Sequence, residues 1–484
     1  MTRRLLFCLP TTQLSGGVKV IFEIANRLIE QGVAVDIFSF AGEPLWFPLQ
    51  APIITQKDID AIPFANYDFV FVSNAFMIPM VLPHLGQTRG VFFCQDYESF
   101  HHSQSTTYDE FLTDDPTFME LYQIPLPIIT VSQTVQSLIR ERIGRQSYYV
   151  SVGIDKTAFK PGSAVSNRTH KRVLMVGNYL MPYKGMPDGF AALTCLAQEI
   201  PIELVLVTQE KRNRHLLAAL PFPVEVHHCP RELDMPGIIR GCDTYCCTSW
   251  YEGLGLPGLE AFHCGVPVVS TRDFGVSDYG VDGVNLLLAE PNDPADLTRA
   301  LRQILIDNAL AAKLREAAFE TVASRYNWDD SITTFLQALA EIEATYAAPL
   351  VDATAMANLV HRLEVEGNLT PIATFRRFRE LVTALNALFV TLRASENSPT
   401  EEQTTQLRHI VAELREYTLN PKAEYYKAFR AQYDRARLVL GQVGTSQLTK
   451  CLIALLRRKE QDPVQYPATF REIEYSKPDP DETP

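Results

Sequence analysis

Apolar and polar positions follow two alternating patterns over the first 150 residues. Arg4–Leu9 is an almost continuous apolar run, which is typical of a strand buried on both faces of a parallel sheet. The next stretch, Gly17–Glu30, has helical periodicity and ends before Gly32. One face of that helix would carry Ile21, Ile24, Ala25, Leu28 and Ile29. Val33–Phe40 is the next predicted strand, so the order predicts parallel pairing with a right-handed crossover.

The alternation of strands and helices continues to the end of the first series, and a second series follows it. Further strands of the first series are predicted at Phe69–Ser73, Gly90–Cys94 and Ile128–Val131. Strands of the second series are predicted at Val173–Gly177, Ile202–Thr208, Val224–His228, Thr244–Thr248 and Val266–Ser270. Two such series predict an α/β fold with two Rossmann-like doubly wound domains, at residues 1–156 and 157–328.

After the second series the strand signals end. A helix is predicted at Asn327–Thr345, within a return segment at 329–349. An all-α C-terminal extension is predicted over 350–474, and a polar, proline-rich tail at 475–484 is predicted to be disordered. The strongest helical periodicities of the extension lie at Phe375–Leu392, Glu401–Tyr417 and Ala423–Lys459. Its helices are the part that we expect to be available for self-association or for a partner protein.

The charge of the chain is acidic and uneven. The formal net charge is −13, and residues 1–350 hold 26 Lys and Arg against 39 Asp and Glu. Residues 351–484 hold 18 of each sign. A body this acidic argues against nucleic acid as the main partner. It also weakens the case for simple electrostatic docking on an anionic membrane.

Nine scattered cysteines are typical of a reduced cytosolic protein and not of a disulfide framework, so we expect a cytoplasmic location. A zinc site is the alternative use of some of them. The residues concerned are His227, His228, Cys229, Cys242, Cys246 and Cys247. Their spacing matches no standard ligand pattern, and most fall in predicted strands, so no metal is expected. No apolar run reaches about 18 residues, so no membrane-spanning helix is expected.

The segment from Ser249 to Pro267 is the one most suited to chemistry. It follows a predicted strand and opens a helix near Pro257, where proline suits the first turn. Gly253 and Gly255 let the backbone approach an anion, and a helix N-terminus turns its unpaired amides toward one. Carboxylates beside such a site, at 252 and 260, are placed to accept hydrogen bonds from sugar hydroxyls. On spacing alone, a capped helix with two solvated glutamates remains an alternative.

The run EGLGLPGLEA at 252–261, followed by CGVPVV at 264–269, resembles the two-glutamate signature of glycosyltransferase family 4. The resemblance extends over roughly residues 4–345. Other matching motifs, in chain order, are Gly16-Gly17, Val152-Gly153-Ile154-Asp155, Lys184-Gly185, Asp282-Gly283-Val284-Asn285 and Tyr326-Asn327-Trp328. The family has the two-domain GT-B fold, retains the anomeric configuration and needs no metal, so the resemblance implies these properties here.

The resemblance also implies roles for single residues of the second domain. Glu252 would contact the donor sugar and Glu260 the nucleotide ribose. The amides of Gly253, Leu254 and Gly255 would hold the diphosphate.

Four further residues complete the predicted donor site, namely Gly16, Gly17, Asn178 and Lys184. Lys184 would neutralise the leaving diphosphate, and a metal-free transfer needs such a fixed cation on physical grounds too. Gly16 and Gly17, at the start of the first helix, would face the diphosphate from the other domain.

Two departures from the family pattern stand out. The family usually has arginine a few residues before the lysine, where this chain has Asn178, and a neighbouring arginine such as Arg231 is the candidate replacement. The family often has histidine after the strand that ends at Cys94, where this chain reads Gln-Asp-Tyr-Glu at 95–98. That sequence resembles the branch that contains rhamnosyltransferases of bacterial surface polysaccharides. Asp96 is therefore a third candidate for catalysis, beside Lys184 and Glu252, with an ordinary polar loop as the alternative.

The sequence therefore predicts a glycosyltransferase of hexosyltransferase type that uses a nucleotide sugar as co-substrate and no other cofactor. The acceptor would be a glycan or a lipid-linked saccharide, and the enzyme cytoplasmic, with peripheral attachment at the inner face of the membrane as a variant. A catalytically weak nucleotide-sugar-binding protein, an assembly subunit and a sugar-nucleotide epimerase of the same fold are the alternatives.

Overall fold

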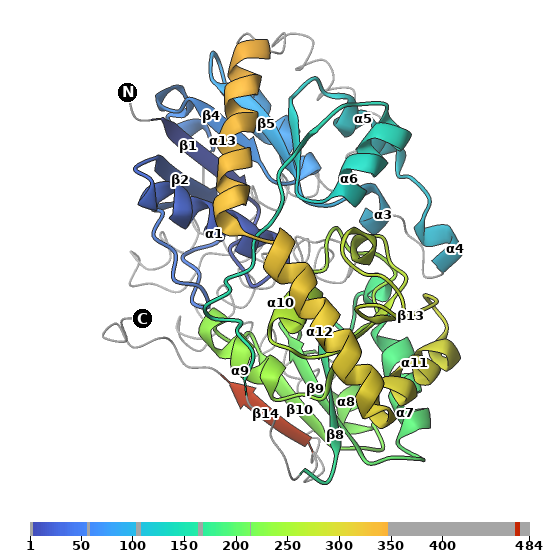
Figure 1. Cartoon of the computed structure of the whole chain (residues 1–484). Coiled ribbons are helices and arrows are strands. Elements are labelled where there is room, and N and C mark those ends of the chain that lie inside the picture. Colours follow the sequence, from blue (N-terminus) through green and yellow to red (C-terminus); the bar gives the residue numbers. More distant parts are fainter. Residues whose placement is uncertain are drawn as a thin grey trace, which may run out of the picture. The chain divides into compact units, whose positions relative to one another are not determined.

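Two parallel sheets with helices on their faces form two Rossmann-like domains (Figure 1). The computed structural model describes residues 3–55, 59–102, 108–162, 168–212, 214–346 and 470–474. All of them belong to one compact unit of the chain, Met1–Asp352 with Tyr466–Pro484. The three strongest helical segments predicted between 375 and 459, and the tail predicted over 475–484, lie outside the described residues.

The first sheet has the strand order β3-β2-β1-β4-β5-β6-β7, and every pair in it is parallel. Its strands are β1 (Arg4–Leu9), β2 (Ala34–Ser39), β3 (Ile53–Ile54), β4 (Phe69–Val72), β5 (Arg89–Cys94), β6 (Ile128–Thr130) and β7 (Tyr148–Tyr149). The order reverses between β1 and β4. In doubly wound sheets, ligands bind outside the carboxyl ends of the strands at such a reversal.

The second sheet has the order β13-β12-β11-β8-β9-β10-β14, again all parallel, and reverses between β8 and β11. Its strands are β8 (Lys171–Val176), β9 (Ile202–Thr208), β10 (Val224–His228), β11 (Thr244–Cys247), β12 (Val268–Thr271), β13 (Leu287–Ala289) and β14 (Phe470–Glu474). The predicted α/β class with two Rossmann-like domains is confirmed.

The principal helix of the first domain begins where the sequence allows an N-cap. Helix α1 (Gly16–Glu30) starts after Ser15, whose hydroxyl accepts a hydrogen bond from the amide of Val18. Its apolar face is buried against the sheet, with Ile21 and Leu28 fully inaccessible to solvent. The other helices of this domain are α2 (Ile78–Val81), α3 (Ser99–His102), α4 (Tyr108–Phe111), α5 (Pro116–Gln123) and α6 (Gln133–Leu138).

In the second domain the helices are α7 (Met186–Leu196), α8 (His215–Ala218), α9 (Met235–Arg240), α10 (Leu256–His263), α11 (Pro294–Ile306) and α12 (Asn308–Arg325). The chain then returns to the first domain. Helix α13 (Trp328–Thr345) packs its Phe335 against Phe7, Phe71 and Phe93 of the first sheet. Figure 1 shows α13 along the first domain and α12 along the second.

The two crossings between the domains touch each other. The first runs through residues 150–159 and the second through 326–328. The amide of Ile154 donates to the carbonyl of Tyr326 at 3.4 Å. A Cβ at Gly153 would lie 2.5 Å from the backbone nitrogen of Trp328, so only glycine fits at this contact.

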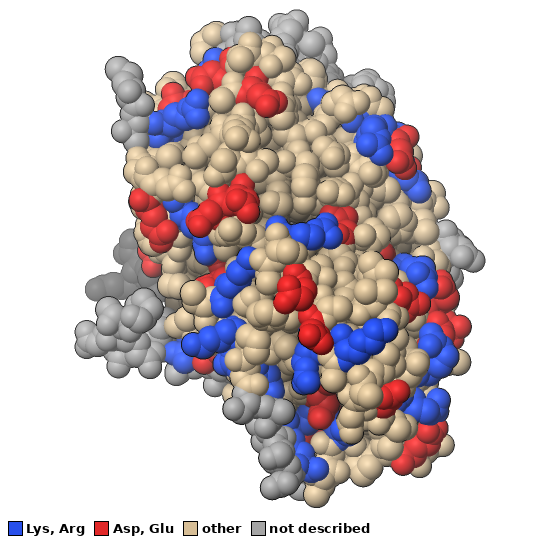
Figure 2. All heavy atoms as spheres, in the orientation of Figure 1, with Lys and Arg blue, Asp and Glu red and all other residues tan. Residues whose placement is uncertain are grey.

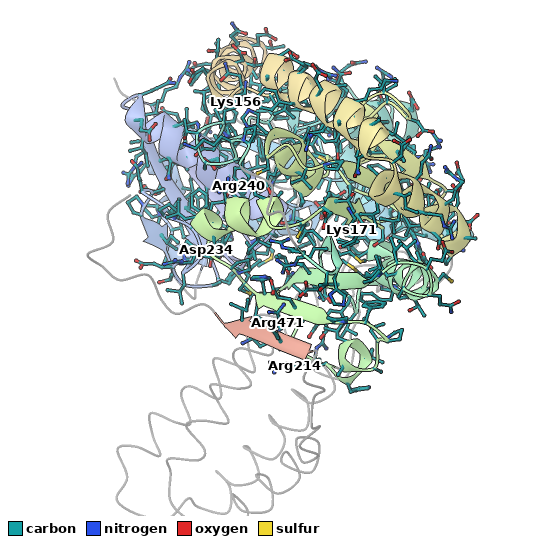
Figure 3. The ribbon with its side chains drawn as sticks, turned by 60° about the horizontal axis from the view of Figure 1, so that its bottom comes forward. Lys156, Lys171, Arg214, Asp234, Arg240 and Arg471 are labelled. Atoms are coloured by element: carbon teal, nitrogen blue, oxygen red, sulfur yellow. The ribbon has the colours of Figure 1, made fainter. Side chains whose placement is uncertain are left out.

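One predicted boundary is wrong in its last residues. The span expected to be helical, 350–474, ends in strand β14, which pairs with β10 at the edge of the second sheet (Figure 3). Arg471 of this strand pairs with Glu203 and with Glu225, the latter at 2.9 Å. Strand β14 reads FREIE, in which three of the five residues are charged, so it lacks the apolar run that marks the other strands.

Charged side chains of both signs are interspersed on the face seen in Figure 2. Within the described ranges, no helix is both long and apolar enough to cross a membrane.

Candidate active site

Most of the predicted site residues lie after the carboxyl ends of strands at or next to the two reversals in strand order. The Gly16-Gly17 turn follows β1, and Asp96 follows β5. Lys184 lies in the connection after β8, and the segment 252–255 lies in the connection after β11. Both sheets thus present their candidate residues at the edge where doubly wound domains bind ligands.

Lys184 and Glu252 form an ion pair in the second domain. The Lys184 Nζ lies 2.7 Å from Oε1 of Glu252, and the hydroxyl of Ser249 donates to the same oxygen at 2.5 Å. Burial, the largest single effect, lowers the pKa of Lys184, but the charge and hydrogen bond of Glu252, together with Tyr183 and Cys247, outweigh it, and the pKa is raised. A buried ammonium that stays charged is thus held beside the carboxylate predicted to bind the sugar.

The turn that carries Lys184 is attached to the end of β11. The Thr248 hydroxyl donates to the carbonyl of Lys184 at 2.7 Å, and the amide of Trp250 donates to the carbonyl of Tyr183 at 2.7 Å. Gly185 follows in a left-handed conformation, φ 54°, where a Cβ would lie 2.0 Å from the carbonyl oxygen of Thr248. Glycine at this position is therefore what allows the close approach of the two connections.

The start of helix α10 has the features of an anion site. Gly255 is its N-cap in a left-handed conformation, φ 83°, and Pro257 stands in the first turn. Among the residues that the structure describes, the amides of Gly253, Leu254 and Gly255 donate no backbone hydrogen bond. Unpaired amides at a helix N-terminus are suited to bind a phosphate.

The first domain approaches this segment closely. A Cβ on Gly253 would lie 2.3 Å from the carbonyl oxygen of Gln95, and one on Gly17 would lie 3.3 Å from Nε2 of the same glutamine. A Cβ on Gly16 would meet Leu256 of α10 at 3.7 Å. The two glycine segments and Gln95 therefore face each other across the domain interface.

Asp96 is partly buried at the same interface. Burial raises the pKa of its carboxyl to about 7, while a hydrogen bond with Tyr251 and the charge of Lys184 oppose the rise. The Tyr251 hydroxyl also accepts the amide of Tyr97 at 2.8 Å. Tyr251 belongs to the second domain and directly precedes Glu252, so it connects the Asp96 loop to that segment. Sequence reasoning gave this tyrosine no role, although it lies in the segment 249–267, because it precedes the two-glutamate motif.

Glu98, the other acid of that loop, has a structural contact. Its two carboxylate oxygens accept the amide of Ala75 at 2.9 and 3.2 Å, at the end of β4. Asp273 was not predicted, although it is fully buried in the same electrostatic neighbourhood as Glu252 and Lys184. Burial, the largest effect, raises the pKa of Asp273 to about 8.

Glu260 lies in a second ionic cluster, at the contact of α10 with α1. Lys19 of the first domain places its Nζ 2.5 Å from Oε1 of Glu260 and also pairs with Glu232. Burial raises the pKa of Glu260 to about 7, against the lowering effect of Lys19. Neither Lys19 nor Glu232 was a sequence candidate, because nothing local to either residue marks it.

Asn178 and Arg231, the positions considered for a second cation, have separate partners in the structure. Asn178 is buried and donates to Glu210 at 3.4 Å. Arg231 donates instead to Asp234 in its own loop, at 2.7 Å. A different guanidinium shares a partner with Asn178, because Arg212 binds both oxygens of Glu210, at 2.8 and 2.6 Å. Arg212 is therefore the arginine that the structure associates with position 178.

The residues considered for zinc do not converge. His227 lies 2.9 Å from Glu225, and Cys246 is buried in β11. Over the described part of the chain, no group of three or more His, Cys, Asp or Glu side chains is arranged to hold a metal ion.

Comparison with known proteins agrees with this geometry. Residues 157–321 match the family model described as glycosyl transferases group 1. The MMP α-(1→4)-mannosyltransferase of Mycolicibacterium hassiacum is 26% identical over 235 residues, which are 46% of this chain and 56% of that protein. The chain thus spans about half the length of the curated relatives that it matches.

Solved structures share the fold at lower identity. Sucrose-phosphate synthase from Thermosynechococcus elongatus superposes with a TM-score of 0.58 at 16% identity, over 71% of this chain and 100% of that one. HepE from Anabaena, solved in complex with UDP and glucose, gives a TM-score of 0.57 at 17% identity, over 70% of this chain and 100% of that one.

Proposed function

We propose that this chain transfers a sugar from a nucleoside diphosphate sugar to a hydroxyl of a glycan or lipid-linked saccharide. The match of residues 157–321 to the family model described as glycosyl transferases group 1 supports the proposal. The likeness to a mannosyltransferase supports a hexose as the transferred sugar. The complex of HepE with UDP makes a uridine nucleotide the first donor to test.

The ion pair of Lys184 with Glu252, next to the unpaired amides before α10, is the observation that carries the proposal. A bound donor would separate this ion pair and contact each of its two residues. Its diphosphate would take the Lys184 ammonium and the amides of Gly253, Leu254 and Gly255, and its sugar hydroxyls would take Glu252. As the glycosidic bond breaks, the electron pair goes to the diphosphate, and Lys184 stabilises the charge that develops there.

Asp96 belongs to the acceptor side of the reaction in this proposal. Its loop comes from the first domain and meets the second domain at Gly253 and Tyr251. A carboxyl with a pKa near 7 is suited to share a proton with an acceptor hydroxyl. Gly16 and Gly17 would close the opposite side of the diphosphate.

Retention of the anomeric configuration and independence of metal are part of the proposal. Lys184 supplies the fixed positive charge at the leaving group that a metal would otherwise supply. A cytoplasmic location, with or without peripheral membrane attachment, and self-association through residues 350–474 remain predictions from the sequence.

The test is transfer from a panel of UDP-, GDP- and dTDP-hexoses to mixed oligosaccharides, with and without EDTA. We expect release of the nucleoside diphosphate and a glycosidic product that keeps the donor's anomeric configuration, at the same rate in chelator. Loss of activity in EDTA that magnesium or manganese restores would contradict the role of Lys184.

One alternative rests on the departure from the family pattern at position 178. Asn178 stands where a second cation is usual, which favours a protein that binds nucleotide sugars and turns them over weakly. Slow hydrolysis of a bound donor, measured without acceptor over hours, distinguishes the two. Binding without hydrolysis or transfer favours the alternative, and an isomerised sugar in the same assay indicates an epimerase.

A further inference from the structure

Lys19 joins the two domains at the residue that would bind the donor ribose. It lies in the second turn of α1, in the first domain, and pairs with Glu260 of α10 and with Glu232 before α9. Both carboxylates belong to the second domain. The three side chains are nearly buried, with exposed fractions of 12% for Lys19, 12% for Glu232 and 5% for Glu260.

The surroundings of Lys19 leave it little freedom. Its ammonium lies 4.5 Å from the ring centroid of Phe159, in the first crossing between the domains. Glu23, one turn further along α1, adds a third negative charge near Lys19 and pairs with Arg27 on the same helix. In the described part of the chain, Glu260 and Glu232 thus share Lys19 as a cationic partner.

We propose that Lys19 is a positioning residue for the donor: acting from the opposite domain, it holds and orients the carboxylate of Glu260 for the ribose hydroxyls. The inference rests on the proposed function and adds to it a dependence of ribose recognition on contact between the two domains. Lys19 bonds Oε1 of Glu260, so Oε2 is the oxygen that the ribose hydroxyls would use.

The charge balance gives this arrangement a pH dependence. Burial raises the pKa of Glu260, the Lys19 charge lowers it, and the charges of Glu232 and Glu23 raise it further. Cys264, the C-cap of α10 one turn after Glu260, interacts with Glu260 and with Arg240 of α9. In a variant without Lys19, burial and the charges of Glu232 and Glu23 would all favour the protonated, neutral form of Glu260. A protonated Glu260 accepts fewer hydrogen bonds from a ribose, so binding would weaken at neutral pH and recover as pH rises.

The experiment compares UDP with 2′,3′-dideoxy-UDP, and GDP with its dideoxy analogue, by calorimetric titration from pH 6 to 9. The variants are Lys19→Met, which keeps the length of the side chain without its charge, and Lys19→Arg, which keeps the charge. Lys313→Met, an exposed lysine on α12, is the matched control. Far-UV circular dichroism checks folding, and Lys19→Gln replaces Lys19→Met if the latter does not fold.

We expect Lys19→Met to bind the ribonucleotide about tenfold more weakly at pH 7, a loss typical of a charge-assisted hydrogen bond. The dideoxy nucleotide should bind unchanged, the ribonucleotide should regain affinity toward pH 9, and Lys19→Arg should resemble the wild type. Equal losses for both nucleotides, or none, would overturn the inference while leaving the proposed function standing. A wild type that binds none of the nucleotides would overturn both.

Discussion

The carboxylate of Asp278 lies on the first turn of helix α6, where Oδ1 accepts hydrogen bonds from both the amide of Thr134, at 2.9 Å, and its hydroxyl, at 2.5 Å. The other oxygen accepts the amide of Gln133 at 2.7 Å. Asp278 belongs to the second domain and α6 to the first. An acid of one domain thus satisfies amides that the start of a helix in the other leaves unpaired.

Replacing Asp278 with alanine should loosen this contact between the domains. The variant leaves two amides of α6 without their acceptor, so the free energy of unfolding should fall by about 1–3 kcal/mol. Urea denaturation of the wild type, Asp278→Ala, Thr134→Val and the double variant measures it. Effects of the two single changes that simply add in the double variant would show that the residues act separately.

Replacing Lys184 should nearly abolish transfer without unfolding the protein. Loss of one electrostatic group at the leaving atoms typically costs on the order of 10²–10³ in turnover. The comparison is steady-state kinetics of Lys184→Met with the wild type, at saturating donor. Arg212→Met is measured beside it, because Arg212 is the arginine joined through Glu210 to position 178. If folded Lys184→Met keeps more than about a tenth of its turnover, the leaving-group charge is carried elsewhere.

A single methyl group at Gly253 should keep the domains from reaching their contact. The Cβ of Gly253→Ala would lie 2.3 Å from the carbonyl oxygen of Gln95, and a backbone atom cannot move aside as a flexible side chain can. We expect turnover to fall about a hundredfold, the usual effect of a misplacement near 1 Å. Gly237→Ala on α9 is the matched control, since nothing lies within 4 Å of its Cβ. Equal activity of the two variants would show that the approach is not needed for the reaction.

Asp273 should make the protein less stable as pH rises. Its pKa is about 8 in the folded protein because of burial, against about 3.9 in an unfolded chain. Between these values the folded state holds a proton that the unfolded state has lost, so the free energy of unfolding decreases with pH from about 4 to about 8. Asp273→Asn should flatten this slope in urea denaturation at pH 5, 6, 7 and 8. An unchanged slope would mean that other groups cause it.

Much of this architecture could be predicted from local patterns in the sequence. The predicted buried strands lie where apolar runs occur, for instance β1 at Arg4–Leu9 and β9 at Ile202–Thr208, because burial on both faces requires such runs. The segment 252–260 was recognised as one motif because its glycines, proline and glutamates act within a single turn and helix. The strands β3, β7, β13 and β14 were missed. Strands β3 and β7 have only two residues each, and β14 has three charged residues in place of an apolar run.

The tertiary structure alone decided which distant charges meet. Lys19 and Glu260 are 241 positions apart in the chain, and no local pattern pairs them. The same holds for Asp278 with Thr134, and for Arg212, which rather than Arg231 lies beside Asn178 through Glu210. Local sequence determines whether a segment is a strand, a helix or an anion-binding turn, because those choices depend on neighbours along the chain. Which side chains face each other across two domains depends on the crossings through Gly153 and Trp328, and on burial that exists only when both sheets have formed.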